Sequence, residues 1–194
     1  SGDSPAALAE LAGIILNDGL RKPRLRLQKL HFAAGTPYET VLEAVPPAEQ
    51  RVYPAELAQT VKKAMLDVVE NGTARRAFQS LMSGTTAIPI GGKTGTGDNR
   101  LETHGDDGRM IDSRVISRTA TFVFVIGNRF FGTVTAYVPG PGAERYHFTS
   151  ALPVQLFRHL APSLAPLFQM QTSSVPSDAT LTAGAVNAGA ATSR

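Results

Sequence analysis

Residues 91–96, Gly-Gly-Lys-Thr-Gly-Thr, place a lysine, two hydroxyl side chains and an unsubstituted backbone position in one short segment. If this segment is an extended strand, side chains alternate between its faces, so Lys93 and Gly95 share one face. The ammonium group then lies beside a position where no side chain keeps a ligand away from the backbone. Thr94 and Thr96 fall on the opposite face, so only an edge position and strand twist can bring them to the same ligand. The pattern suits the binding of an anionic acyl substrate that lies along the segment as an added strand.

The Gly-Lys-Thr run also invites comparison with a phosphate-binding loop, which opens on a glycine and leads into a helix. In this chain the opening position of that motif is residue 87, an alanine. The residues that follow are Gly97, Asp98 and Asn99, which favour a turn rather than the start of a helix. The sequence therefore does not predict nucleotide binding.

Two helices are expected before the lysine segment. Apolar residues recur at helical spacing from Tyr53 to Glu70, and Pro54 suits a first turn. Asn71-Gly72 is expected to end this helix with a left-handed cap, and Thr73 to cap a short helix that carries Arg75, Arg76 and Phe78. Gly91 and Gly92 are interpreted as a bulge or a flexible point before the lysine.

After the lysine segment, the sequence predicts a polar loop, a hairpin and a helix. The loop is expected from Gly97 to Ser113. Residues 120–127 and 132–138 are β-branched and aromatic runs separated by Asn128-Arg129, which favours an antiparallel hairpin. A helix is expected over 151–160, capped by Ser150, and its buried face is predicted to hold the following residues: Leu152, Leu156, Phe157 and Leu160.

Composition sets broad limits on the kind of protein. A chain of 194 residues with 42% hydrophobic residues can bury one sizeable core. We expect one domain portion over 1–167 and a disordered, low-complexity tail over 168–194, where Ala, Ser, Thr and Gly leave little to bury. The net charge of +3 is too small to predict nucleic-acid binding, and the absence of cysteine rules out disulfides and thiolate metal sites. No apolar run is long enough to span a bilayer.

The lysine segment resembles the Lys-Thr-Gly box of penicillin-binding proteins and serine β-lactamases, which accompanies Ser-x-x-Lys and Ser-x-Asn motifs. The order of "VVENGTARRAF" and "IPIGGKTGTG" resembles the approach to the third strand of the transpeptidase domain in class A, bifunctional penicillin-binding proteins. "SPAALAELAGIILNDG" is similar to an earlier helix of that domain, "AAGTPYETVL" to the connection after it, and "SRTATFVFVIGNRFFGTVTAYVPGP" to its fourth and fifth strands. The resemblance covers residues 4–161 and implies an α/β (α+β) fold, an antiparallel sheet covered by helices.

The nucleophile of that family is missing from this sequence. No serine is followed three positions later by lysine, and Ser1-Gly2-Asp3 only imitates Ser-x-Asn. A serine hydroxyl needs a nearby base before it can attack an acyl group, so this chain alone is predicted to be inactive. We therefore expect it to be the C-terminal part of a longer protein. Its earlier part would carry the nucleophile, a membrane anchor and, in the class A type, a glycosyltransferase domain.

The resemblance implies specific roles for four residues. Lys93 would stabilise the substrate carboxylate and tune the serine of the second motif. The hydroxyls of Thr94 and Thr96 would bind the carboxylate, the Thr96 N–H would complete an oxyanion hole, and Gly95 would leave room for substrate. No cofactor or metal is implied. His104, Asp106 and Asp107 lie in the expected loop, which we interpret as solvated because one imidazole and two carboxylates do not define a metal geometry. In the family this loop borders the active-site cleft, so the resemblance implies substrate contact.

The function implied is that of a serine-type D,D-transpeptidase, which cross-links peptidoglycan stem peptides through an acyl-serine intermediate. Its partners would be a D-Ala-D-Ala stem peptide, β-lactam antibiotics and the remainder of its own transpeptidase domain. Its location would be the bacterial cell envelope, on the periplasmic side of the inner membrane. Two alternatives stay open at this point. One is a D,D-carboxypeptidase or β-lactamase-type hydrolase, and the other is a non-catalytic structural or regulatory domain of the envelope.

Overall fold

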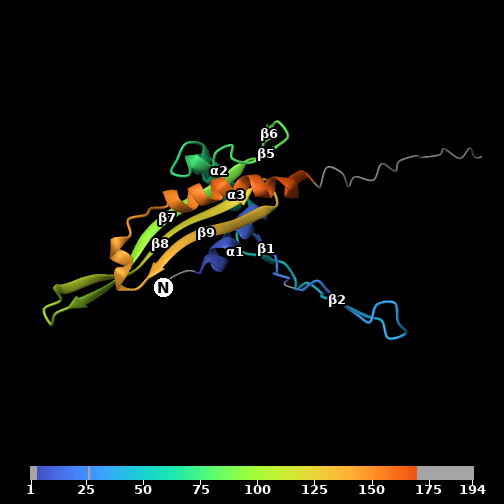
Figure 1. Ribbon diagram of the computed structural model, residues 1–194, viewed down its shortest axis with the longest axis horizontal. Helices are drawn as coiled ribbons and strands as arrows, with labels where there is room; N and C mark the ends of the chain where they lie inside the picture. Colours follow the sequence, from blue (N-terminus) through green and yellow to red (C-terminus); the bar gives the residue numbers. More distant parts are fainter. Residues whose placement is uncertain (1–3, 26, 170–194) are drawn as a thin grey trace, which may run out of the picture.

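The centre of the protein is a three-stranded antiparallel sheet with helices on both faces (Figure 1). This computed structural model describes residues 4–25 and 27–169. The sheet consists of β7 (Ile90–His104), β8 (Met110–Ile126) and β9 (Phe130–Pro139), in the order β7-β8-β9. The predicted hairpin is β8–β9, paired from Ile126↔Phe130 to Ser117↔Pro139.

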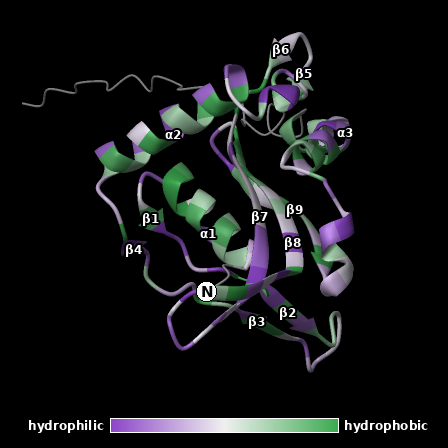
Figure 2. Ribbon diagram, turned by 90° about the vertical axis from the view of Figure 1, so that its left-hand side faces the viewer, coloured by the Kyte–Doolittle hydropathy of each residue, from purple (hydrophilic) through white to green (hydrophobic). Residues whose placement is uncertain are grey.

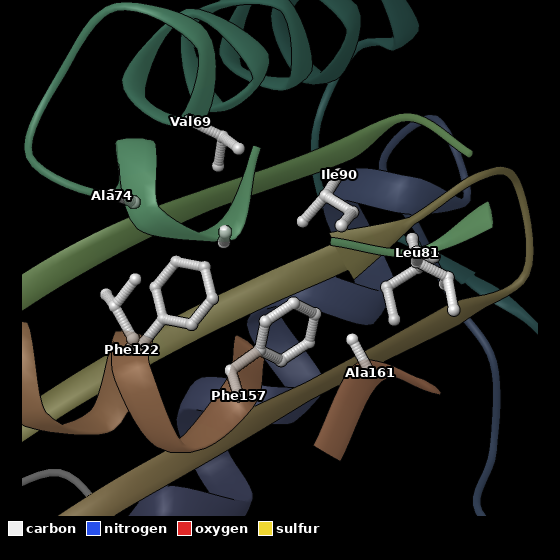
Figure 3. Close-up of a cluster of buried hydrophobic side chains, with 10 residues drawn as sticks. Val69, Ala74, Leu81, Ile90, Phe122, Phe157 and Ala161 are labelled. Atoms are coloured by element: carbon white, nitrogen blue, oxygen red, sulfur yellow. The ribbon is translucent and has the colours of Figure 1, made fainter. Parts of the chain in front are cut away.

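One face of the sheet is covered by α3 (Ala151–Gln169) and by the short 3-10 helix η1 (Arg75–Ala77). Their main buried cluster is drawn in Figure 3, where Phe122 of β8 meets Phe157 of α3. The two rings pack edge to face with centroids 5.4 Å apart, a favoured aromatic geometry. This face therefore forms the larger part of the core.

The length and the buried face of α3 differ from the sequence-based prediction. The helix runs to Gln169, with Pro162 and Pro166 inside it. Of the predicted face, Phe157 is buried as expected, whereas Leu152, Leu156 and Leu160 are exposed. Val154 and Ala161 complete the buried face instead. Both sets have helical spacing, and contact with η1 and β8 decides between them. Nor does Ser150 cap the helix with its side chain, because the Leu152 N–H donates to the Thr149 carbonyl at 3.0 Å and Pro153 has no N–H.

The other face of the sheet is covered by α1 (Pro5–Leu16) and α2 (Ala55–Glu70). The Ser4 hydroxyl accepts the Ala7 N–H at 3.2 Å, which satisfies one of the free amides at the start of α1. Both helices contribute to a second buried cluster on β8, made of the following residues: Ala12, Leu16, Met65 and Val125.

The end of α2 lies at the predicted place but is built differently. Asn71 has φ of −124°, so the helix does not end in a left-handed residue. Gly72 is required for close packing instead, since a β-carbon there would lie 2.9 Å from the Val68 carbonyl oxygen. Thr73 does not cap η1 either, because the capping position of η1 is Ala74, which makes no side-chain hydrogen bond.

The predicted polar loop from Gly97 to Ser113 is wrong. β7 and β8 continue as a two-stranded ribbon to the pair His104↔Met110, with register shifts at Asn99/Arg100 and Thr103/His104. Figure 1 shows this ribbon extending beyond the helices. Nearly all of its side chains are exposed on both faces, so its sequence lacks the apolar alternation by which a strand is usually predicted.

Three small two-stranded sheets and a second 3-10 helix complete the elements of the described chain. β2 (Lys29–Phe32) pairs with β3 (Thr40–Glu43) and forms an arm that projects from the body (Figure 1). The remaining elements are β1 (Leu20–Arg21) with β4 (Gln50–Arg51), β5 (Met82–Ser83) with β6 (Thr86–Ala87), and η2 (Pro141–Arg145).

The predicted tail over 168–194 lies outside the described residues from position 170 onward, and its first two positions end α3. None of the described helices is both long enough and apolar enough to cross a membrane. In Figure 2, α1 is coloured mostly green for hydrophobic residues, whereas green and purple alternate along α2.

Candidate functional site

β7 is an edge strand, and its hydrogen-bonding phase fixes which residues face the open edge. The Gly127 N–H donates to the Pro89 carbonyl at 2.9 Å, one pair before Ile90↔Ile126. Because hydrogen-bonded pairs alternate along an antiparallel ladder, odd-numbered residues of β7 bond to β8 and even-numbered ones point away. Thr94 and Thr96 therefore turn their backbone N–H and C=O groups to the edge where no described strand pairs.

Lys93 lies on the face of the sheet that α1 and α2 cover, opposite Val123 of β8. It stands at the border of an apolar hollow of about 460 Å³, lined by α1 between Leu8 and Ile15 and by α2 between Val61 and Val68. The Lys93 ammonium donates to the Thr94 carbonyl at 2.6 Å. It therefore reaches around the strand to the same open edge.

Gly95 is the next residue of β7 on the Lys93 face, and the space above its backbone is open. A β-carbon built on Gly95 would meet no atom within 4 Å, and its φ is not in the left-handed region. Gly91 and Gly92 do not form a bulge, because the register is regular from Ile90 to Asn99. Instead, both glycines allow close packing: a β-carbon on Gly91 would lie 3.2 Å from the Leu66 backbone nitrogen of α2, and one on Gly92 would clash with the Phe122 ring.

The side chains of Thr94 and Thr96 lie on the face opposite Lys93, as strand alternation predicts. Thr94 is buried, and its hydroxyl is 2.6 Å from that of Thr73. The Thr96 hydroxyl accepts the Ser150 N–H at 2.8 Å, directly before α3. The structure thus brings the four predicted residues together along one strand, while both threonine hydroxyls contact the protein itself.

A cluster of hydrogen bonds around Arg118, at the end of this edge, was not predicted from the sequence. Arg118 donates to Asp98 at 2.8 Å and, through two of its nitrogens, to the Phe148 carbonyl at 2.9 and 2.8 Å. Its side chain is only 17% exposed, so this ion pair is better shielded than the other pairs of the described chain. Asp98↔Arg118 is a cross-strand pair, and extending the strand pairing from Ile126 would have found it.

The other residues considered for a site lie elsewhere. His104 is the last residue of β7, while Asp106 and Asp107 belong to the turn between β7 and β8. The Asp107 carboxylate accepts the Arg109 N–H at 3.0 Å and so stabilises that turn. Asp106 and Asp107 therefore sit in a short turn at the end of the ribbon rather than in a long loop beside the lysine.

This arrangement can bind an extended chain and stabilise negative charge. The open edge offers backbone donors and acceptors to an added strand, and the ammonium lies within reach of a carboxylate or an oxyanion. Gly95 leaves the approach clear. The strand itself supplies no activated nucleophile, so its chemistry is binding and charge stabilisation.

Comparison with solved structures identifies the fold. The chain is similar to penicillin binding protein 3 of Mycobacterium tuberculosis in complex with ampicillin, with a TM-score of 0.56 and 22% identity over 91% of this chain. It is also similar to the ceftriaxone acyl-enzyme complex of penicillin-binding protein A from M. tuberculosis, with a TM-score of 0.51 and 20% identity over 81% of this chain. A third match is the TP domain of penicillin-binding protein 3 from Burkholderia pseudomallei, with a TM-score of 0.50 and 21% identity over 85% of this chain.

The chain spans only part of each matching structure, namely 37%, 32% and 43% of these three chains. No protein-family model matches the sequence, and no curated protein does. The structural matches confirm the predicted fold class, an antiparallel sheet covered by helices. Over residues 4–169, the chain has the fold of a part of penicillin-binding protein structures.

Proposed function

We propose that this chain is the substrate-binding part of a penicillin-binding D,D-transpeptidase domain of the bacterial cell envelope. The observation that carries the proposal is the open edge of β7, where Lys93 reaches the Thr94 carbonyl at 2.6 Å and Gly95 leaves the approach free. The fold adds support, because its solved neighbours include complexes with ampicillin and with ceftriaxone as an acyl-enzyme. The nucleophilic serine and its lysine lie outside this chain.

In the proposed reaction, the terminal D-Ala-D-Ala of a stem peptide lies antiparallel to residues 93–96. The Thr96 N–H and C=O face the edge and bond the substrate backbone as a neighbouring strand would. The Thr96 N–H is one donor to the oxyanion that forms at the attacked carbonyl, and the nucleophile's own N–H is the other. Thr94 contributes through its backbone.

Lys93 supplies the positive charge of the site. Its ammonium is tethered to the strand that binds substrate, so little reorganisation is needed when a carboxylate replaces the Thr94 carbonyl as acceptor. Serine acylation then releases D-Ala, and an amine of a second stem peptide takes the acyl group. Penicillins acylate the same serine, since the β-lactam carbonyl occupies the position of the scissile peptide.

The test is acylation of the intact protein by a fluorescent penicillin, measured by stopped flow. Lys93→Ala should slow acylation by roughly two to three orders of magnitude and leave the melting temperature unchanged. Lys63→Ala is the matched control, because Lys63 is an exposed lysine of α2 that lies outside the proposed binding strand. It should acylate at the wild-type rate.

An acylation rate of Lys93→Ala within threefold of wild type would make Lys93 an ordinary surface residue and overturn the proposal. The acyl acceptor is identified in the same material. Incubation with a D-Ala-D-Ala peptide and an amine acceptor should give the cross-linked product; release of the free acid alone would indicate a carboxypeptidase or β-lactamase-type hydrolase. No acylation of the intact protein would favour a non-catalytic envelope domain.

A further inference from the structure

A second hollow, of about 480 Å³, lies on the opposite side of α1 from the hollow beside Lys93. Its floor is apolar. Ala6, Ala9 and Ile14 of α1 line it together with Phe131 of β9. The floor is tightly built, because a β-carbon on Gly13 would lie 2.6 Å from the Phe131 ring. Its volume lies in the range of small-molecule sites.

The rim of this hollow is basic. Arg21, Lys22 and Arg24 come from β1 and the segment after it, and Arg129 comes from the turn between β8 and β9. The lining residues include a single carboxylate, that of Glu10. Four cations against one anion leave a net positive field over an apolar surface, which attracts negatively charged ligands.

The existing ion pairs do not neutralise this rim. Both Arg21 and Arg24 contact the Glu10 carboxylate, the latter at 3.4 Å, so two cations share one anion. Lys22 lies 3.8 Å from Glu49, which is not part of the lining. Within the described chain, no carboxylate pairs with Arg129, whose guanidinium lies 5.8 Å from the centroid of the Phe130 ring.

We propose that this hollow binds an anionic group carried on an apolar body. The apolar body would cover the exposed parts of Ala9 and Phe131 above the buried Ile14, and burial of this surface favours binding. The anion would lie between Arg24 and Arg129, because guanidinium groups match the planar donors that carboxylates and phosphates require. The proposal does not rest on the transpeptidase assignment, since β7 contributes nothing to this hollow.

The experiment is isothermal titration calorimetry on the intact protein at low ionic strength, with octyl phosphate and octanoate below their micelle concentrations. Both anions should bind, and raising the salt concentration should weaken binding because exposed charges are screened. Octyl glucoside tests the apolar body alone, and inorganic phosphate tests the anion alone. Each of these should bind at least about tenfold more weakly than the better octyl anion.

The charge requirement is tested with the double variant Arg24→Gln/Arg129→Gln, which should weaken binding about tenfold. Arg114→Gln/Arg145→Gln removes the same charge from two exposed arginines elsewhere and should bind like wild type. Arg24→Gln also removes an ion pair with Glu10, so Arg129→Gln is tested alone as well. Arg129 makes no ion pair in the described chain, and Arg129→Gln should weaken binding about threefold. Lys93→Ala should bind normally.

The outcomes separate cleanly. A clear preference for octyl phosphate indicates a phosphate-bearing amphiphile as the ligand, and a preference for octanoate indicates a carboxylate; either supports the site. The proposal is wrong if neither octyl anion binds, as when another part of the intact protein covers the hollow. It is also wrong if octyl glucoside binds equally well or if both double variants have the same affinity.

Discussion

The hydroxyl oxygens of Thr73 and Thr94 lie 2.6 Å apart, across the gap between the segment that follows α2 and strand β7. Thr94 belongs to the proposed binding strand, yet its side chain is only 7% exposed and points away from Lys93. The contact ties β7 to the connection between α2 and η1. It separates the two functions of Thr94, since the hydroxyl holds the strand in place while the backbone faces the open edge.

Thr94→Val should therefore affect stability more than substrate binding. The substitution keeps the shape of the side chain and removes the hydrogen bond to Thr73, which is exposed enough to bind water instead. We expect a loss of about 1 kcal/mol in the free energy of unfolding, measured by urea denaturation. Penicillin acylation of the intact protein should stay within threefold of wild type.

Thr94→Ser is the control for this prediction, because it retains the hydroxyl and should recover most of the stability. If Thr94→Val instead slowed acylation more than tenfold with little loss of stability, the Thr94 hydroxyl would contact the substrate directly. The side-chain role that the family resemblance implies would then be the correct one.

The sequence predicts local features well where one pattern repeats. The period of two around Lys93 places Gly95 on the same face and the threonines on the other, and the helical period from residue 53 to 70 predicts α2. The first prediction succeeds because side chains of any extended strand alternate between its faces, and the second because α2 buries one face against the sheet. The β7 half of the ribbon, up to His104, buries neither face, so this strand carries no periodic apolar signal and the sequence predicts a loop.

Features that depend on partners distant in the sequence were not predictable in the same way. The buried face of α3 contains the predicted Phe157 but also Val154 in place of Leu152 and Leu156, because η1 and β8 determine which side is covered. The bond between Ser150 and Thr96 joins residues 54 positions apart, and no short pattern indicates it.

Gly92→Ala tests the packing beneath the proposed site. A β-carbon on Gly92 would lie 2.3 Å from the ring of Phe122, which is fully buried and cannot move without disturbing Phe157. We expect a loss of about 1–3 kcal/mol in unfolding free energy, the usual cost of overpacking a core. Thermal or urea denaturation of the intact protein measures it. Unchanged stability would mean that Phe122 has another position available.

The tip of the β2–β3 arm should respond to acid. The Glu39 carboxylate accepts the Gly35 N–H at 3.0 Å and contacts His31 Nε2 at 2.6 Å. The Gly35 bond, and then the His31 contact, lower the pKa of Glu39 below its ordinary value of 4.5. Because the pKa of Glu39 is lowered in the folded arm, ionised Glu39 stabilises the tip at pH values above 4.5. This contribution is lost as the pH falls through the lowered pKa.

An NMR titration of the intact protein or of this chain would follow the arm. The Glu39 side-chain carboxyl carbon should titrate below pH 4.5, and the Gly35 amide signal should shift together with it. In Glu39→Gln the Gly35 shift should disappear. A Glu39 midpoint at or above its ordinary value would show that the Gly35 and His31 contacts do not form in solution.

The most direct test of ligand binding along β7 is Gly95→Val. A β-carbon at this position meets no protein atom within 4 Å, and the backbone is not left-handed, so the fold itself does not require glycine. Valine also has a higher strand propensity than glycine, so the free energy of unfolding should stay the same or rise by about 0.5–1 kcal/mol. A substrate strand lying over Gly95 would meet the added methyl groups, and penicillin acylation should fall at least about a hundredfold.

Thermal unfolding and stopped-flow acylation of the same intact protein, with Gly95→Ala as an intermediate step, distinguish the explanations. Normal acylation of Gly95→Val would show that the ligand does not lie along this strand, whereas a joint loss of acylation and stability would mean that the fold needs glycine here. Lost acylation with retained stability is the expected result, because the space above Gly95 is bounded by no part of the described chain.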